Sequence, residues 1–248
     1  MQGGKTMKPR QAHTYLSISP SFIALSLASM IAFLIFIHSA VMVCWSSKAC
    51  GIAMESINRF GHLFDLSREM NIPTWYSVLQ LFAVAFALAL AARIQQLKSL
   101  PSIAWWGLSA MFLYMSLDEA TEMHGLWRTG FEDFAIPGTS HVFFSWIIPA
   151  TFVVFAVGVI YTRWLFSLPR RTATLFFVAG FIFILGALVF EGIGAFLADE
   201  TFFNPSYLVV STIEETLELY GILIMLCAVF DYLQGQGIKV VLAPEPYL

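Results

Sequence analysis

Long apolar stretches alternate with short polar segments along the whole chain. Each stretch is about as long as the ~20 residues that a helix needs to cross the hydrocarbon core of a bilayer, and charged residues and prolines mark the connections. The pattern predicts an all-α, polytopic transmembrane bundle of six helices that forms a single integral membrane domain over residues 1–248. The six expected helices lie at 21–45, 74–94, 103–124, 141–165, 172–198 and 207–232.

The composition supports this expectation and removes one class of partner. Hydrophobic residues make up 58% of the chain and charged residues only 12%, whereas a soluble domain carries about 25% charged residues. The formal net charge is -3 and no run of Lys or Arg forms a basic patch, which argues against nucleic acid as a partner. The expected partner is therefore the lipid bilayer.

The distribution of Lys and Arg predicts that both termini lie in the cytoplasm, because cytoplasmic loops carry an excess of these residues. With the N-terminus inside, the inner side holds nine of them: Lys5, Lys8, Arg10, Arg93, Lys98, Arg163, Arg170, Arg171 and Lys239. The outer side holds only Lys48, Arg59, Arg68 and Arg128. An aromatic belt near the helix ends is expected from Trp45, Trp75, Trp105, Trp106, Trp127 and Trp164.

The acidic residues are distributed unequally across this topology. Fourteen of the sixteen lie on the outer side or in the outer ends of helices, and only Asp231 and Glu245 lie on the inner side. Because neighbouring helices are antiparallel, those within apolar stretches should lie at a similar depth. These are Asp118, Glu119 and Glu122 in the third helix, Glu191 in the fifth, and Glu214, Glu215 and Glu218 in the sixth.

Helical spacing groups some of these carboxylates on common faces. Asp118 and Glu122 are four residues apart and share a face with Tyr114. In the sixth helix, Glu214 and Glu218 share a face with Ser211 and Gly221. We therefore expect each pair to point in one direction.

The fifth expected helix carries a stripe of small residues, Gly180, Ala187 and Gly194. Small residues let transmembrane helices approach closely. Glu191 lies near this stripe, so its side chain should point at another helix and not at lipid. The same stripe is also a candidate docking face for a partner subunit or a second copy of the chain.

Carboxylates in hydrocarbon need a compensating charge, proton or water. An ionised carboxylate there costs at least ~2.5–3.5 kcal/mol, and none of the expected spans holds a Lys or Arg within its apolar part. Iron, manganese and zinc accept oxygen ligands together with imidazole, so a divalent metal is one candidate. The candidate ligands are Asp118, Glu119, Glu122, His124, His141, Glu191, Glu214, Glu215 and Glu218.

Two alternatives to a metal site remain open. If the helices end a few residues earlier than expected, the carboxylates form a solvated rim or share protons. They can also form a pathway for protons or ions. The Glu-x-x-His signature of di-iron bundles is absent at this position, because Thr121 lies three residues before His124.

Two other features carry weaker expectations. His38 lies within the first helix with no second histidine at a comparable depth, which favours a hydrogen-bonded core histidine over a haem ligand. Cys44 and Cys50 lie near the outer end of that helix, so one disulfide or a free pair is expected there, while Cys227 is expected to pack in the membrane.

Three segments resemble a family of multipass bacterial membrane proteins of unassigned function. They are FDLSREMNIPTWYS at 64–77, SLDEATEMH at 116–124 and IEETLELYG at 213–221. The resemblance implies a location in the bacterial inner membrane. It differs at one position, since Gly125 stands where a carboxylate is expected after the histidine. The positions of interest that it implies are Asp65, Glu69, Asn71, Asp118, Glu119, His124, Glu214 and Glu215.

Three functions are compatible with these features. The first is a membrane metalloenzyme acting on a membrane-soluble substrate, with an outward-facing carboxylate and histidine pocket between the third, fourth, fifth and sixth helices. The second is a proton- or cation-coupled carrier that uses the same carboxylates. The third is a non-catalytic accessory or assembly subunit of a membrane complex. The sequence assigns no reaction to any of them.

Overall fold

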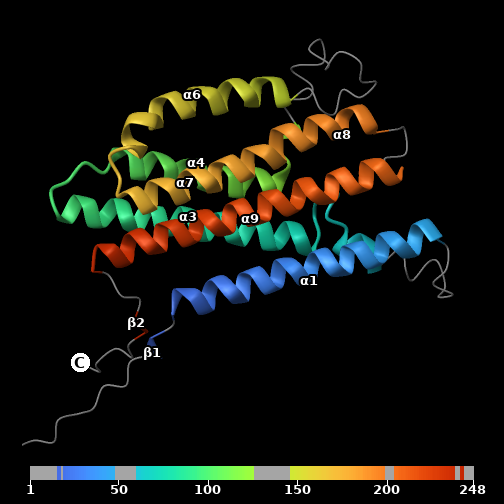
Figure 1. The fold of residues 1–248 in the computed structure, drawn as a ribbon, viewed down its shortest axis with the longest axis horizontal. Helices are drawn as coiled ribbons and strands as arrows, with labels where there is room; N and C mark the ends of the chain where they lie inside the picture. The colour runs from blue at the N-terminus through green and yellow to red at the C-terminus, as the bar shows by residue number, and fades with distance from the viewer. Residues whose placement is uncertain are drawn as a thin grey trace, which may run out of the picture.

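The computed structural model describes residues 16–17, 19–47, 60–125, 146–198, 204–237 and 241–242. Successive long helices run in alternating directions through one elongated bundle (Figure 1). They are α1 (Pro20–Ser47), α3 (Ile72–Leu97), α4 (Ile103–Thr121), α6 (Ile147–Leu165), α7 (Arg170–Ile184), the π-helical segment η3 (Leu185–Phe190), α8 (Glu191–Leu197) and α9 (Pro205–Gly235). Two short strands, β1 (Leu16–Ser17) and β2 (Val241–Leu242), pair in antiparallel register.

The all-α, membrane-type character expected from the sequence is confirmed. Within the described ranges, five helical segments are long and apolar enough to cross a membrane: α1, α3, α6, α9 and the continuous segment Arg170–Leu197 that comprises α7, η3 and α8. The expected third span corresponds to α4, which is not among the five. It also ends at Thr121, three residues before the expected boundary at 124.

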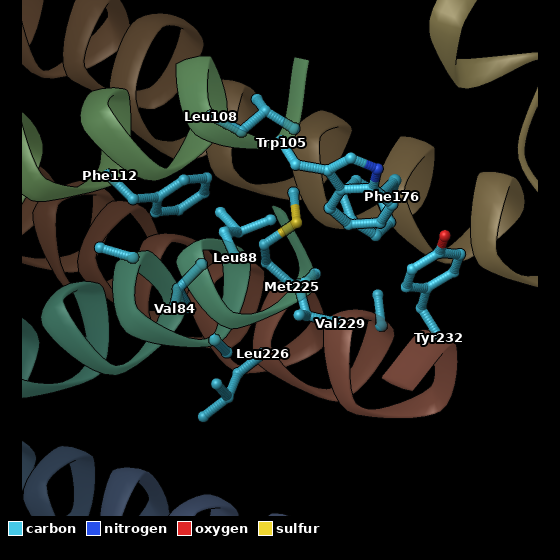
Figure 2. Close-up of a cluster of buried hydrophobic side chains, with 14 of the residues drawn as sticks. Val84, Leu88, Trp105, Leu108, Phe112, Phe176, Met225, Leu226, Val229 and Tyr232 are labelled. Atoms are coloured by element: carbon cyan, nitrogen blue, oxygen red, sulfur yellow. The ribbon is translucent and has the colours of Figure 1, made fainter. Parts of the chain in front are cut away.

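Helix α9 lies at the centre of the bundle and contacts α1, α3, α7, η3 and α8, while α3 and α4 form the most extensive pair. The core between α3, α4, α7 and α9 includes Trp105, which is 2% exposed and stacks on Tyr232 with ring centroids 4.4 Å apart (Figure 2). Trp105 was expected in an interfacial aromatic belt. Its side chain packs in the core, where its large apolar surface is removed from solvent, and the expected belt stays a prediction.

Two of the helices, α3 and α9, have an asparagine N-cap followed by a proline in the first turn. The Asn71 side chain accepts a hydrogen bond from Thr74 N (3.1 Å), and the Asn204 side chain accepts one from Tyr207 N (2.8 Å). A proline follows within the first two positions of both α3 and α9. These side chains satisfy backbone N–H groups that the first helical turn leaves without partners.

The expected small-residue stripe is not the place where helices approach most closely. A Cβ atom at Gly180 would meet nothing within 4 Å, and one at Gly194 would make only ordinary contact. The close approaches are at Gly186, where an added Cβ atom would lie 2.8 Å from the carbonyl oxygen of Glu214, and at Gly221, where it would lie 2.9 Å from the backbone nitrogen of Phe183. The predicted stripe assumed a regular α-helix. The wider turn of η3 contains one extra residue, so the residues before and after η3 do not share the face that regular spacing predicts.

Helix α6 is attached to the bundle near its two ends. At one end, Ile147 packs against Ala195. At the other end, the Tyr161 hydroxyl donates to Ala104 O (3.2 Å), and Trp164 meets Trp105 edge to face at 5.0 Å. Figure 1 shows α6 standing apart from α7 and α9 along its length. Apart from Ile147, no residue of α6 is fully buried.

Candidate functional site

A cavity of about 1210 Å³ separates the middle of α6 from α4, α7 and α9. Its wall is apolar along most of its length, with Phe112, Val157 and Phe176 among the lining residues. Acidic residues line it at the end of the bundle where α4 ends and α9 begins, which we call the carboxylate end. The acidic residues that line the cavity are Asp65, Glu69, Asp118, Glu119, Glu191, Glu214, Glu215 and Glu218.

Two of these carboxylates hold His124 between them. The imidazole Nδ1 lies 3.1 Å from Asp118 Oδ2, and Nε2 lies 3.3 Å from Glu69 Oε1. Asp118 also accepts the backbone N–H of His124 at 2.6 Å. Both ring nitrogens can donate only when the imidazole is protonated. The hydrogen bonds to Asp118 and Glu69 accordingly raise the pKa of His124 to about 10.

This pairing supplies a positive charge at the carboxylate end. Because the folded-state pKa of His124 lies above its usual value, the stabilisation is complete below about pH 6.5 and is lost as the pH rises through about 10. Both nitrogens of the ring are occupied by carboxylates, so neither offers a lone pair to a metal ion. The role of His124 as a metal ligand stays a prediction.

Glu191 and Glu214 form a second pair of carboxyl groups. Their carboxyl groups lie close enough to repel each other when both are ionised. The indole N–H of Trp146 also donates to Glu191 Oε1 at 3.3 Å. Glu191 follows directly after η3, and Glu214 is 7% exposed. The expectation that Glu191 points at another helix agrees with these contacts.

Glu119, Glu215 and Glu218 face the same end of the cavity from α4 and α9. Ser77 of α3 lines this end as well. Among the residues that the structure describes, neither Glu215 nor Glu218 forms an ion pair with a basic side chain. Glu215 and Glu218 are one helical turn apart, so two like charges there repel each other when both are ionised.

A buried histidine attaches the loop before α3 to two other helices. His38 of α1 is fully buried, and its Nδ1 accepts the backbone N–H of Leu66 at 3.0 Å. Nε2 therefore carries the proton and donates to the Thr212 hydroxyl of α9 at 3.0 Å. Asp65 Oδ1 lies 3.6 Å from Nδ1, too far for a hydrogen bond, and Asp65 pairs with Arg68 Nε at 3.2 Å. The expected hydrogen-bonded core histidine is confirmed.

The structure gives Asn71 a local role. Its amide nitrogen donates to Asp65 O at 2.6 Å and to Arg68 O at 2.9 Å. Its side-chain oxygen accepts the backbone N–H of Thr74 and so caps the N-terminus of α3. Asn71 thus fixes the turn that carries Asp65 and Glu69 to the cavity. Nearby, Ser67 Oγ and Glu69 Oε2 are buried with no hydrogen-bond partner among the described residues, and both residues line the cavity.

One expected face is not formed. Glu122 lies at the C-cap of α4 with φ 53°, in the left-handed region, and it does not line the cavity. Tyr114 and Asp118 do line it. The predicted common face of Asp118 and Glu122 is absent because the helix ends before Glu122, and residues four apart share a face only within a helix. By contrast, Ser211, Glu214, Glu218 and Gly221 all line the cavity as the spacing predicts.

Some expected residues lie beyond the described ranges. His141 and Cys50 are both outside them, so their predicted roles stay predictions. Cys44 is disulfide-bonded, and Cys227 is a free thiol in α9. Within the described ranges, no group of three or more His, Cys, Asp or Glu side chains is placed to hold one metal ion. A metal site completed by other residues, such as His141, also stays a prediction.

Two residues of the site were missed in the sequence. Trp146 donates to Glu191, and Tyr207 lines the cavity beside Gly194. The signal for Tyr207 was present, because it lies seven residues before Glu214 on the same face of a regular helix. No comparable signal marks Trp146, which directly precedes α6 and has its partner at the start of α8.

Comparison with known proteins identifies a family without assigning an activity. No curated protein and no solved structure matches the chain. The model of a domain of unknown function, DUF8692, matches residues 30–233 and so covers all the helices that form the cavity, up to the last turn of α9. With more than half of its length matched, the chain belongs to the DUF8692 family.

Proposed function

We propose that this protein is a multipass membrane protein that binds a cationic ligand at the carboxylate end of its cavity. The observation that carries the proposal is the imbalance of charge in the cavity wall. Among the described residues, eight acidic side chains line the cavity, whereas the basic side chains in its wall are Arg68 and His124. Arg68 contacts Asp65, and His124 is held by Asp118 and Glu69.

The remaining carboxyl groups favour an added cation. Glu119, Glu215 and Glu218 line the same end of the cavity, and none of them forms an ion pair among the described residues. An ionised carboxylate away from water costs several kcal/mol unless it is paired, protonated or bound to a cation. A ligand that brings positive charge to Glu215 and Glu218 removes repulsion as well as this cost.

An organic ammonium group fits the described residues better than a bare metal ion. A metal such as zinc needs three or four ligands at fixed distances, and the described side chains offer no such group. An ammonium has three N–H donors and no comparable geometric demand. Carboxylates at Glu215 and Glu218 offer several acceptors to these donors, as does Glu69 Oε2, which has no hydrogen-bond partner within the described part of the chain.

The orientation in the membrane forms part of the proposal. The charge bias of the loops predicts six spans with both termini in the cytoplasm, which places the carboxylate end at the outer surface of the bacterial inner membrane. Alternating helix directions and the β1–β2 pairing near the two ends of the chain support this arrangement. A cation bound at Glu215 and Glu218 would then lie toward the outer side of the membrane.

The test compares the double substitution Glu215→Gln with Glu218→Gln against Glu122→Gln, which changes an acid outside the cavity wall. Amides keep the shape of the protonated acid, so the double variant should fold. Butylammonium at millimolar concentration should raise the melting temperature of the purified wild type and of Glu122→Gln, because a ligand stabilises the state that it binds. The double variant should lose this response.

Metal analysis of the same preparations tests the competing hypothesis. Stoichiometric iron, manganese or zinc in the wild type that disappears in the double variant would assign the site to a metal instead of an ammonium. An identical butylammonium response in all three proteins would refute the proposed cation site.

A further inference from the structure

Two features of the cavity have no role in binding a small cation. The first is its size, since about 1210 Å³ exceeds the ~300–1,000 Å³ of ordinary small-molecule pockets. The second is its lining, which is mostly apolar away from the carboxylate end. A small ammonium ion fills neither the volume nor the apolar wall.

The cavity extends along nearly the whole of α6. Its wall includes Trp146 at one end of this helix and Leu165 at the other. A rise of about 1.5 Å per residue makes this distance roughly 25–30 Å. A single lipid chain reaches across about half of the ~30 Å hydrocarbon core. The cavity is therefore long enough for one chain that starts at the carboxylate end.

The cavity also opens toward the surroundings of the bundle. Val153 of α6 and Phe177 of α7 both line it, yet they are 55% and 62% exposed. Phe177 stacks with Phe181 of the same helix, which also lines the cavity. An apolar side chain that is both lining and exposed marks an opening, and in a bilayer this opening faces lipid tails.

We propose that the apolar part of the cavity holds the hydrocarbon chain of a cationic amphiphile taken from the membrane, with its ammonium head group at Glu215 and Glu218. This inference rests on the cation site proposed above. The charge of the acidic end selects the positive head group, and the apolar wall accepts the chain. The ligand keeps the orientation of an outer-leaflet lipid, so it can enter sideways between α6 and α7 without turning over.

Two glycines offer positions where a larger side chain would fill part of the cavity without displacing the helices. Gly158 of α6 and Gly180 of α7 line the cavity, and a Cβ atom at either position would meet nothing within 4 Å. Phenylalanine at either position should occupy space needed by the chain. Gly192 of α8 is the matched control, because its Cβ position is equally open but it does not line the cavity.

The experiment measures binding of hexadecylammonium and butylammonium to the full chain in non-ionic detergent by titration calorimetry. Each probe partitions into the same micelles for every variant, so ratios between variants report the protein. Gly158→Phe and Gly180→Phe should each weaken hexadecylammonium binding at least about tenfold, the effect of about 1.4 kcal/mol. Butylammonium binding should stay unchanged, and Gly192→Phe should affect neither probe. Size-exclusion profiles and melting temperatures verify that the variants fold.

The outcomes separate this inference from the proposed cation site. Unchanged hexadecylammonium binding in both cavity-filled variants would overturn the chain-binding inference, while a butylammonium response that needs Glu215 and Glu218 would preserve the cation site. Equally tight binding of anionic hexadecyl sulfate would overturn the selection of a positive head group. Loss of hexadecylammonium binding in Glu215→Gln/Glu218→Gln and in both cavity-filled variants, but not in Gly192→Phe, would support both proposals together.

Discussion

Helices α4 and α6 have the same length, 19 residues, but they pack in opposite ways. α4 buries Trp105, Leu108, Ser109, Phe112 and Ser116, whereas α6 buries only Ile147. Yet α6 is apolar enough to qualify as a membrane span and α4 is not. Hydropathy therefore indicates which helices tolerate lipid, but it does not indicate which helices pack closely.

The polar groups of α4 help to explain the difference. The hydroxyls of Ser109 and Ser116 donate to carbonyl oxygens of α3, Ala85 O at 2.8 Å and Val78 O at 3.0 Å. The Thr151 hydroxyl of α6 instead donates to Ile147 O of its own helix at 2.8 Å. Small residues and hydrogen bonds between helices favour close packing in membranes, where burial of apolar surface alone gives little advantage over lipid.

The largest expected effect tests this contrast with two aromatic residues. Trp105→Ala should destabilise the protein by about 3–5 kcal/mol, because it leaves a cavity in a packed core. Phe155→Ala on α6 should change stability by no more than about 0.5 kcal/mol, since the Phe155 side chain is 71% exposed. Unfolding in detergent measured for both variants checks the difference. Similar losses would mean that α6 is packed as closely as α4.

Glycine substitutions should give effects of opposite sign on the two helices. At Gly158, alanine meets open space and should stabilise α6 by about 0.5–1 kcal/mol through its higher helix propensity. At Gly107 of α4, the added Cβ would collide with the Tyr161 hydroxyl, which should cost about 1–2 kcal/mol as that side chain moves. Melting temperatures of Gly107→Ala and Gly158→Ala should therefore move in opposite directions. A rise in both would show that the Tyr161 contact does not attach α6.

The smallest expected effect concerns hydroxyl groups. Ser109→Ala removes a hydrogen bond between helices and should cost about 0.6 kcal/mol, the average for such bonds in a membrane protein. Thr151→Val removes only a bond within one helix and should be neutral within about 0.5 kcal/mol. Equilibrium unfolding of both variants sharpens the contrast. A larger loss for Thr151→Val would contradict the account of α4 packing.

The sequence correctly predicted which residues share a face in the regular helix α9, but not where a helix is irregular. The face of α9 with Glu214 and Glu218 was predicted correctly because α9 keeps one period from Pro205 to Gly235. Glu122 was misplaced because α4 ends in a left-handed residue that is neither Gly nor Asn, so the usual C-terminal signal is missing. The cavity beside α6 was also not predictable, since it reflects contacts that α6 does not make.

The π-helical segment has a consequence at the level of the gene. The six residues Leu185–Phe190 contain one more residue than a continuous α-helix needs for the same length. Loss of a single codon there would restore an ordinary helix and rotate the residues on one side of it by about 100° relative to the other. Glu191 would then turn away from Glu214 while every other residue of the chain stayed the same. A one-residue deletion, usually harmful in a helix, would here leave the helix intact and change only what it presents to the cavity.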